Sequence, residues 1–133
     1  MSDFLDIFSL KGKKAVITGG AGILGLSIGM GLGKAGAQVA ICDIVDTEKA
    51  VSNFTSNGIK AKGYHIDVMD KDKIEQCNSE IISDFGEIDI LVNAAGGNIN
   101  AATTSEELTF FDLELSALQK VVGLNLFGGA ILP

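Results

Sequence analysis

A glycine-rich turn between a short apolar run and a helix-like stretch is the feature of this sequence best suited to chemistry. Residues 15–17 predict a buried strand, and a helix-like stretch begins at about Ile23. The spacing G-x-G-x-x-G is formed by Gly20 and Gly22 in the turn and Gly25 in the helix-like stretch. Such a turn brings backbone N–H groups to the start of a helix, where they can bind a pyrophosphate. The segment therefore predicts a dinucleotide site.

An acidic residue downstream supports this interpretation. Residues 38–43 are typical of a second strand and end in Asp43, which lies 18 residues after Gly25. A ribose-binding carboxylate is expected about 20 residues after such a turn. A carboxylate at this place would repel a 2′-phosphate, and the first cation downstream is Lys49. Asp43 therefore predicts NAD in preference to NADP, the alternative being a solvated acid at the end of a strand.

Length and composition predict a soluble globular domain. The chain has 133 residues, of which 47% are hydrophobic, and a net charge of −7. That charge argues against a nucleic-acid surface, which needs Lys and Arg to neutralise phosphates. No apolar run is long enough to span a membrane, and the acidic N-terminus is unlike a signal peptide, so we expect a cytoplasmic protein. Cys42 and Cys77 are expected to be reduced core residues and not metal ligands.

Strand-like and helix-like segments alternate along the chain. The expected strands are 13–18, 38–43, 60–66 and 88–92, and the expected helices are 23–35, 47–56, 74–85 and 115–132. This alternation is typical of a parallel sheet with helices on both faces. The predicted fold class is therefore α/β, with a Rossmann-type doubly wound parallel sheet in a three-layer α/β/α arrangement.

Glycines recur every four residues in the first expected helix. Gly25, Gly29 and Gly33 each cost helix stability, about 1 kcal/mol relative to Ala. Their spacing places them on one face of the helix, where the lack of a side chain permits close approach. We expect Gly29 and Gly33 to pack against the sheet, and Gly25 to serve both packing and the cofactor.

Together these motifs resemble the short-chain dehydrogenase/reductase family. The matching segments occur in the family's order and are residues 18–25, Asp43, Asp67-Val68, Asn93-Ala94-Ala95-Gly96 and Asn125. The turn and the Ala-Ala-Gly-Gly-Asn loop look most like members described as D-mannonate oxidoreductases. The family usually has glycine at the position of Ile23 and a small polar residue at that of Gly22, which leaves the path of the turn open.

The resemblance implies cofactor-binding roles for most of these residues. Asp43 would bind the adenosine ribose, while Asp67 and Val68 would border the adenine. Asp67 could instead cap the helix at 74–85. The residues that would wrap the pyrophosphate are Gly19, Gly22, Ile23, Leu24 and Gly25. Those that would border the cofactor after the fourth strand are Asn93, Ala94, Ala95 and Gly96, with Asn93 also holding neighbouring strands together.

The resemblance also implies catalytic residues that are largely missing from this sequence. The family uses a Ser, a Tyr with a Lys four residues later, and an Asn that supports a water relay. Asn125 matches that Asn, but Tyr64 is the single tyrosine and is followed four residues later by Val68. In the family the other catalysts follow the helix carrying the Asn. Residues 1–133 are therefore expected to be the NAD-binding N-terminal part of such an enzyme, truncated after the fourth strand and the next helix.

Such an enzyme would interconvert an alcohol and a carbonyl, for example on a sugar acid such as D-mannonate. The 133-residue chain alone is expected to be inactive, and the family implies a homo-oligomer, a dimer or tetramer. One alternative is a non-catalytic dinucleotide-binding module. Another is a methyltransferase, which Thr18 and residues 93–96 fit badly.

Two further sets of side chains have expected structural roles. His65, the single histidine, is expected to be packed or hydrogen-bonded within the third strand. Phe110, Phe111 and Leu113 are expected to make core or lid contacts and not to form a base-stacking platform.

Overall fold

The computed structural model describes residues 4–133 and contains one parallel four-stranded sheet. The strands are β1 (Lys14–Thr18), β2 (Gln38–Asp43), β3 (Ala61–His65) and β4 (Ile90–Asn93), in the spatial order β3-β2-β1-β4. β1 lies inside the sheet, so that Ala15 pairs with both Val39 and Ile90. The predicted Rossmann-type α/β fold is confirmed.

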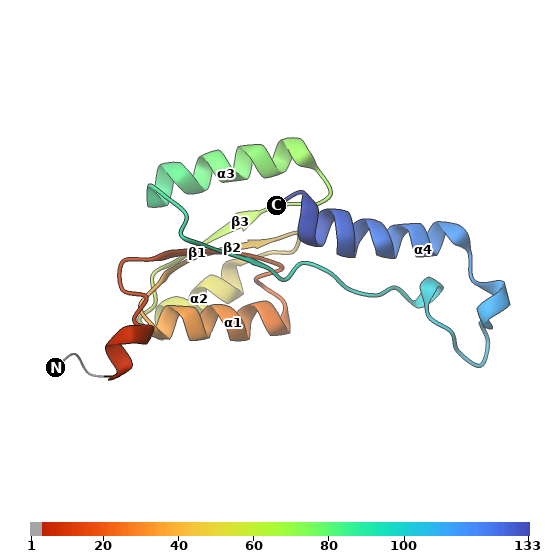
Figure 1. The fold of residues 1–133 in the computed structure, drawn as a ribbon, viewed down its shortest axis with the longest axis horizontal. Coiled ribbons are helices and arrows are strands. Elements are labelled where there is room, and N and C mark those ends of the chain that lie inside the picture. Colours follow the sequence, from red (N-terminus) through yellow and green to blue (C-terminus); the bar gives the residue numbers. More distant parts are fainter. Residues whose placement is uncertain (1–3) are drawn as a thin grey trace.

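Helices cover both faces of this sheet (Figure 1). α1 (Ile23–Lys34) and α2 (Glu48–Ser56) lie on one face, and α3 (Lys71–Phe85) lies on the other. The chain then runs through β4 into α4 (Leu115–Val122), which continues as η4 (Gly123–Ile131). The short 3-10 turns are η1 (Phe4–Phe8), η2 (Asn100–Ala102) and η3 (Phe110–Asp112).

Successive strand residues supply the core on opposite sides of the sheet. On the α3 side, Cys42 of β2 packs in one cluster with Cys77 and Ile81 of α3. On the other side, Ile41 packs in a second cluster with Phe54 of α2. This division follows from the alternation of side chains along a strand that is covered on both faces. Both cysteines are free and buried, as predicted.

The last helix differs from the α-helix expected over 115–132. α4 ends at Val122, and η4 is a π-helix, in which Leu132 N–H donates to the Phe127 carbonyl at 2.9 Å. The Asn125 side-chain amide donates to the Val121 carbonyl at 2.8 Å. In an α-helix that carbonyl would accept from the backbone N–H of residue 125. Its use by a side chain favours the wider turn of a π-helix.

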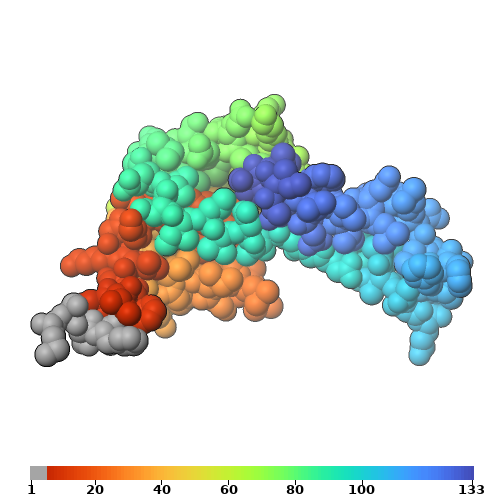
Figure 2. Space-filling view, in the orientation of Figure 1, coloured from red at the N-terminus to blue at the C-terminus, as the bar shows by residue number. Residues whose placement is uncertain are grey.

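The segment from about 98 to 122 projects beyond the sheet and its helices (Figure 2). Phe111 in this segment is 93% exposed and meets Phe110 edge to face, with 5.6 Å between ring centroids. Of their two expected roles, core contacts are wrong for Phe110 and Phe111, because the segment runs past the carboxyl ends of the strands, where no described element covers it. Lid contacts stay a prediction. Leu113 is half-buried. Over residues 4–133, no helix is long and apolar enough to cross a membrane.

The close packing of glycines in α1 leads to a prediction about stability. A Cβ at Gly29 would lie 2.7 Å from Ile17 Cδ1 and 2.8 Å from Phe54 Cζ, and one at Gly33 would meet Ile59. We expect Gly29→Ala to lower the free energy of unfolding by about 1–3 kcal/mol through overpacking. Urea unfolding measures this loss.

Gly31 is a matched control in the same helix, because a Cβ there would have no neighbour within 4 Å. We expect Gly31→Ala to raise the free energy of unfolding by up to about 1 kcal/mol, since alanine favours the helix. Equal effects of Gly29→Ala and Gly31→Ala would show that close packing is not why glycine stands at 29.

Candidate functional site

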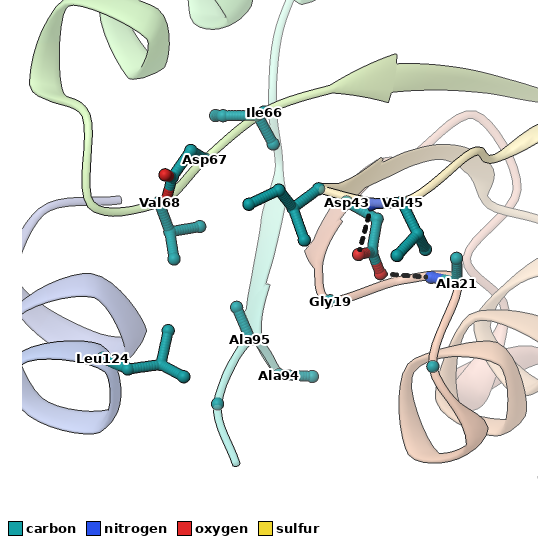
Figure 3. Close-up of a pocket in the computed structure, with 13 residues that line it drawn as sticks. Gly19, Ala21, Asp43, Val45, Ile66, Asp67, Val68, Ala94, Ala95 and Leu124 are labelled. Carbon is teal, nitrogen blue, oxygen red and sulfur yellow. Dashed lines mark hydrogen bonds between the residues drawn. The ribbon is translucent and has the colours of Figure 1, made fainter. Parts of the chain in front are cut away.

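A cavity of about 350 Å³ lies where the four strands end (Figure 3). Most of its walls come from residues at or directly after the ends of β1, β2, β3 and β4, which is where parallel sheets bind ligands. The expected site residues that line it are Gly19, Gly22, Asp43, Asp67, Val68, Ala94, Ala95 and Gly96. The structure thus brings together residues spread over much of the sequence.

Gly19 in the turn after β1 and Gly25 in the first turn of α1 both lack space for a side chain. Gly19 has φ of 64°, and a Cβ there would lie 2.7 Å from both the carbonyl oxygen of Ala94 and the nitrogen of Ala95. A Cβ at Gly25 would collide with the carbonyl oxygen of Gly19. The glycine spacing therefore lets the start of α1, the turn and the chain after β4 lie in direct backbone contact.

The first turn of α1 offers backbone donors. Gly22 is the N-cap and has no side chain to cap the helix, so the N–H groups of Ile23, Leu24 and Gly25 lack a partner within the helix. The side chains of Ile23 and Leu24 are 86% and 74% exposed and do not line the cavity. These residues can therefore bind an anion through their backbone but not through their side chains.

The unusual residue of the turn fits without strain. Ile23 is the first residue of α1, and no described residue other than glycine has positive φ. The glycine that the family usually has at this place is therefore not required by the backbone here. The departure noted in the sequence leaves the turn intact.

Asp43 joins the turn to the end of β2. Its Oδ2 accepts a hydrogen bond from Ala21 N–H at 2.9 Å, and its Oδ1 accepts one from Val45 N–H at 3.2 Å (Figure 3). The carboxylate is thereby fixed on the cavity wall, with further lone pairs on both oxygens. It can both shape the turn and accept hydrogen bonds from a ligand.

Asp67 lies in the cavity wall and does not cap α3. Its Oδ1 accepts from Met69 N–H at 2.9 Å, whereas the N-cap of α3 is Asp70, which accepts from Lys73 N–H at 3.2 Å. The capping alternative for Asp67 is therefore wrong. Val68 is buried next to it and lines the same cavity.

Thr18 connects β1 to the chain after β4. Its carbonyl accepts from Ala94 N–H at 3.1 Å, and its buried hydroxyl accepts from Ala95 N–H at 3.3 Å. Asn93, which was expected to hold the strands together, has an exposed side chain. Within the described chain, Thr18 and not Asn93 makes this side-chain connection.

Asn125 clamps the loop after β4 to η4. Its Oδ1 accepts from Gly97 N–H at 3.0 Å, and its Nδ2 donates to the carbonyls of Gly97 and Val121 at 2.7 and 2.8 Å. The side chain does not line the cavity. The amide thus positions the loop, and a catalytic role of Asn125 stays a prediction.

Tyr64 lies away from the cavity. Its ring is buried in the cluster under α3, and its hydroxyl donates to Asp84 Oδ2 at 2.7 Å. Burial and this carboxylate raise the pKa of Tyr64, and the hydrogen bonds from Lys62 and Tyr64 lower the pKa of Asp84. His65 is exposed on the edge strand β3, contrary to its expected packing. Neither residue lines the cavity.

Sequence reasoning missed the apolar walls of the cavity. These are formed by Ala21, Ile44, Val45, Ile66 and Leu124. Leu124 comes from η4 and is remote in sequence from the other lining residues. The neighbouring Asn125 could have indicated Leu124. Its match to the family's Asn placed this helix near the site before the structure showed it.

The geometry agrees with a match to a known family. Residues 13–132 match the family described as short chain dehydrogenase. The chain belongs to the short-chain dehydrogenase family. Membership excludes the methyltransferase alternative, and the resemblance inferred from the motifs is confirmed.

Individual relatives of this short-chain dehydrogenase cover nearly the whole chain. It is 34% identical to an uncharacterized oxidoreductase of Haemophilus influenzae, covering 94% of this chain and 48% of the relative. It is 32% identical to the 2-dehydro-3-deoxy-D-gluconate 5-dehydrogenase of Formosa agariphila, covering 92% and 45%. The chain spans about half the length of the curated relatives that it matches.

A solved structure is similar over the same extent. A protein of Haemophilus influenzae, provisionally assigned as a D-mannonate oxidoreductase and solved with bound NAD, superimposes with a TM-score of 0.88. The two chains share 32% identity, and the match covers 97% of this short-chain dehydrogenase and 50% of the other. The bound NAD of that protein agrees with the cofactor predicted from Asp43.

The Asn125 clamp leads to a prediction for this short-chain dehydrogenase. In Asn125→Asp, a carboxylate would face the carbonyls of Gly97 and Val121, which now accept from an amide. We expect the free energy of unfolding at neutral pH to fall by about 1–3 kcal/mol, because both donors are lost. Urea unfolding measures this.

The loss of stability in Asn125→Asp should depend on pH. Facing carbonyl oxygens raises the pKa of the introduced carboxyl above its unfolded value of about 3.9. The deficit should therefore be small below about pH 4, where the carboxyl can donate, and grow as pH rises. Asn53→Asp is the control, because Asn53 accepts from Asn57 and a carboxylate keeps that bond. The same pH dependence in both variants would refute the clamp.

Proposed function

We propose that this chain binds NAD in the cavity at the carboxyl ends of the strands. The observation that carries the proposal is the fixed carboxylate of Asp43, which lies on the cavity wall between the glycine turn and the end of β2. Its free lone pairs suit the two hydroxyls of an adenosine ribose. No Lys or Arg lines the cavity in the described chain, so a 2′-phosphate would meet a negative charge without a compensating cation.

The other walls suit the remaining parts of a dinucleotide. The backbone N–H groups at the start of α1 would bind the pyrophosphate, and the residues proposed for this are Gly19, Gly22, Ile23, Leu24 and Gly25. The adenine would lie against Asp67 and Val68, which follow β3. The chain from Asn93 to Gly96 would border the rest of the cofactor. When bound, NAD would supply the hydride acceptor or donor.

We further propose that residues 1–133 are the cofactor-binding part of an oxidoreductase that interconverts an alcohol and a carbonyl. The relative from Formosa agariphila is named for a sugar-acid substrate, and the similar NAD-bound structure is provisionally assigned to D-mannonate. These names support a sugar acid, such as D-mannonate, as the substrate. Asn125 would act in catalysis as the matching Asn of the family does.

The enzymatic proposal has a direct test. If the coding sequence continues beyond Pro133, it should encode a Ser followed by Tyr-x-x-x-Lys, and the encoded protein should form NADH from D-mannonate or a related sugar acid. NAD binding without turnover by that protein would favour the alternative, a non-catalytic dinucleotide-binding module. A cytoplasmic location stays a prediction from the composition.

The cofactor preference is tested at Asp43. We expect Asp43→Ala to weaken NAD binding and to reduce the preference for NAD over NADP by about tenfold or more, since a charge repulsion worth more than about 1.4 kcal/mol is removed. Isothermal titration with both cofactors measures the ratio of the dissociation constants.

Asp46 provides the matched control for this measurement. It follows on the same loop, accepts from Glu48 N–H at 3.0 Å and does not line the cavity. Asp46→Ala should leave the ratio for NAD and NADP unchanged. An unchanged ratio in Asp43→Ala as well would contradict the role of Asp43 at the ribose.

We also propose that the protein forms a homo-oligomer, a dimer or tetramer, through α4 and η4. These helices expose the large apolar side chains of Leu115, Val122 and Phe127, and such patches are typical of protein interfaces. We expect the double variant Leu115→Glu, Val122→Glu to shift the mass in sedimentation velocity towards the monomer. Gln119→Glu, an exposed polar position of the same helix, is the control. Unaltered mass in the double variant would place the interface elsewhere.

A further inference from the structure

η4 contacts two walls of the cavity at places where it carries glycine. A Cβ at Gly128 would lie 2.7 Å from Met69 Sδ and 3.1 Å from Val68 Cγ2. A Cβ at Gly129 would lie 2.8 Å from the carbonyl oxygen of Ala95. Both glycines are buried. The helix backbone thus lies directly against the chain after β3 on one side and against the chain after β4 on the other.

These two contacts reach residues that form the cavity. Val68 and Ala95 both line it, and Leu124 of the same helix contributes its own side chain to the wall (Figure 3). The Asn125 clamp fixes the helix relative to Gly97. η4 is therefore held in place next to the cavity. Because residues 128 and 129 have no side chains, the chain after β3 and the chain after β4 can both lie directly against this helix.

An added side chain at 128 could be accommodated only in part. Met69 is half-exposed, so the end of its side chain can move into solvent. Val68 is buried, and the chain around it is fixed by the bond from Met69 N–H to Asp67 and by the Asp70 cap of α3. The displacement would therefore pass to Val68 and to the cavity that it lines.

We propose that Gly128 and Gly129 are positioning residues that set the separation between the chain after β3 and the chain after β4, and with it the fit of the cofactor's adenosine. They act through Val68 and Ala95 and do not touch the cofactor themselves. This inference rests on the proposed NAD site. It assigns to the π-helix a role in cofactor affinity that is separate from the catalytic role proposed for Asn125.

The test compares AMP and NAD binding by isothermal titration in Gly128→Ala, Gly129→Ala and Gly31→Ala. We expect the first two to raise the dissociation constants of both ligands by about tenfold, the scale of one overpacked methyl group. Gly31→Ala should not change them, because a Cβ there has open space around it.

A second variant separates positioning from a general loss of structure. Val68→Ala removes the buried Cγ2 atom that the added Cβ meets, so Gly128→Ala should raise the AMP dissociation constant less in a Val68→Ala background than in the unaltered chain. An equal increase in both backgrounds, or unchanged AMP binding in folded Gly128→Ala, would overturn the proposal.

The proposal remains testable if the unaltered chain binds neither ligand, a result that would refute the NAD site. In that case, amide hydrogen exchange tests whether η4 controls the separation of the two walls. Faster exchange at residues 66–70 in Gly128→Ala than in Gly31→Ala would support the control of wall separation by η4. Equal exchange in the two variants would overturn it.

Discussion

The site depends on the direct backbone contact between the turn after β1 and the chain after β4. Gly19 has no space for a Cβ beside Ala94, and Thr18 bonds the same chain through both its carbonyl and its hydroxyl. Gly19, Ala94 and Ala95 line the cavity, so this contact forms part of its wall. The start of α1 lies on the same turn through Gly25, so the position of the helix's backbone donors also follows from it. A side chain larger than hydrogen at 19 would separate these three parts.

The charge that a ligand would meet in the cavity comes from backbone N–H groups and from two carboxylates. The cavity's ionisable lining residues, within the described chain, are Asp43 and Asp67. A pyrophosphate would therefore be attracted by the N–H groups and dipole of α1 alone. Asp43 belongs to both halves of this arrangement, because it fixes Ala21 N–H in the turn while presenting its remaining lone pairs to the cavity.

Features that depend on local sequence were predictable, and features that depend on long-range contacts were not. The order of strands and helices follows from periodicity and turn residues. The role of Asp67 was ambiguous, because the residue precedes the helix and only the path of the chain shows that Asp70 caps it. The π-helix was hidden, since the amide that favours it also bonds Gly97, a residue distant in sequence.

The Asn125 side chain also forms the pair of hydrogen bonds that a residue of a neighbouring strand would form. An amide group offers the same donor and acceptor as a peptide unit, and here it exchanges both bonds with the backbone of Gly97. Two antiparallel strand residues exchange bonds in this way. The chain that follows the end of β4 at Asn93 is thus held to η4 by a peptide-like pair of hydrogen bonds, and a rotation of η4 about its axis would move Gly97 with it.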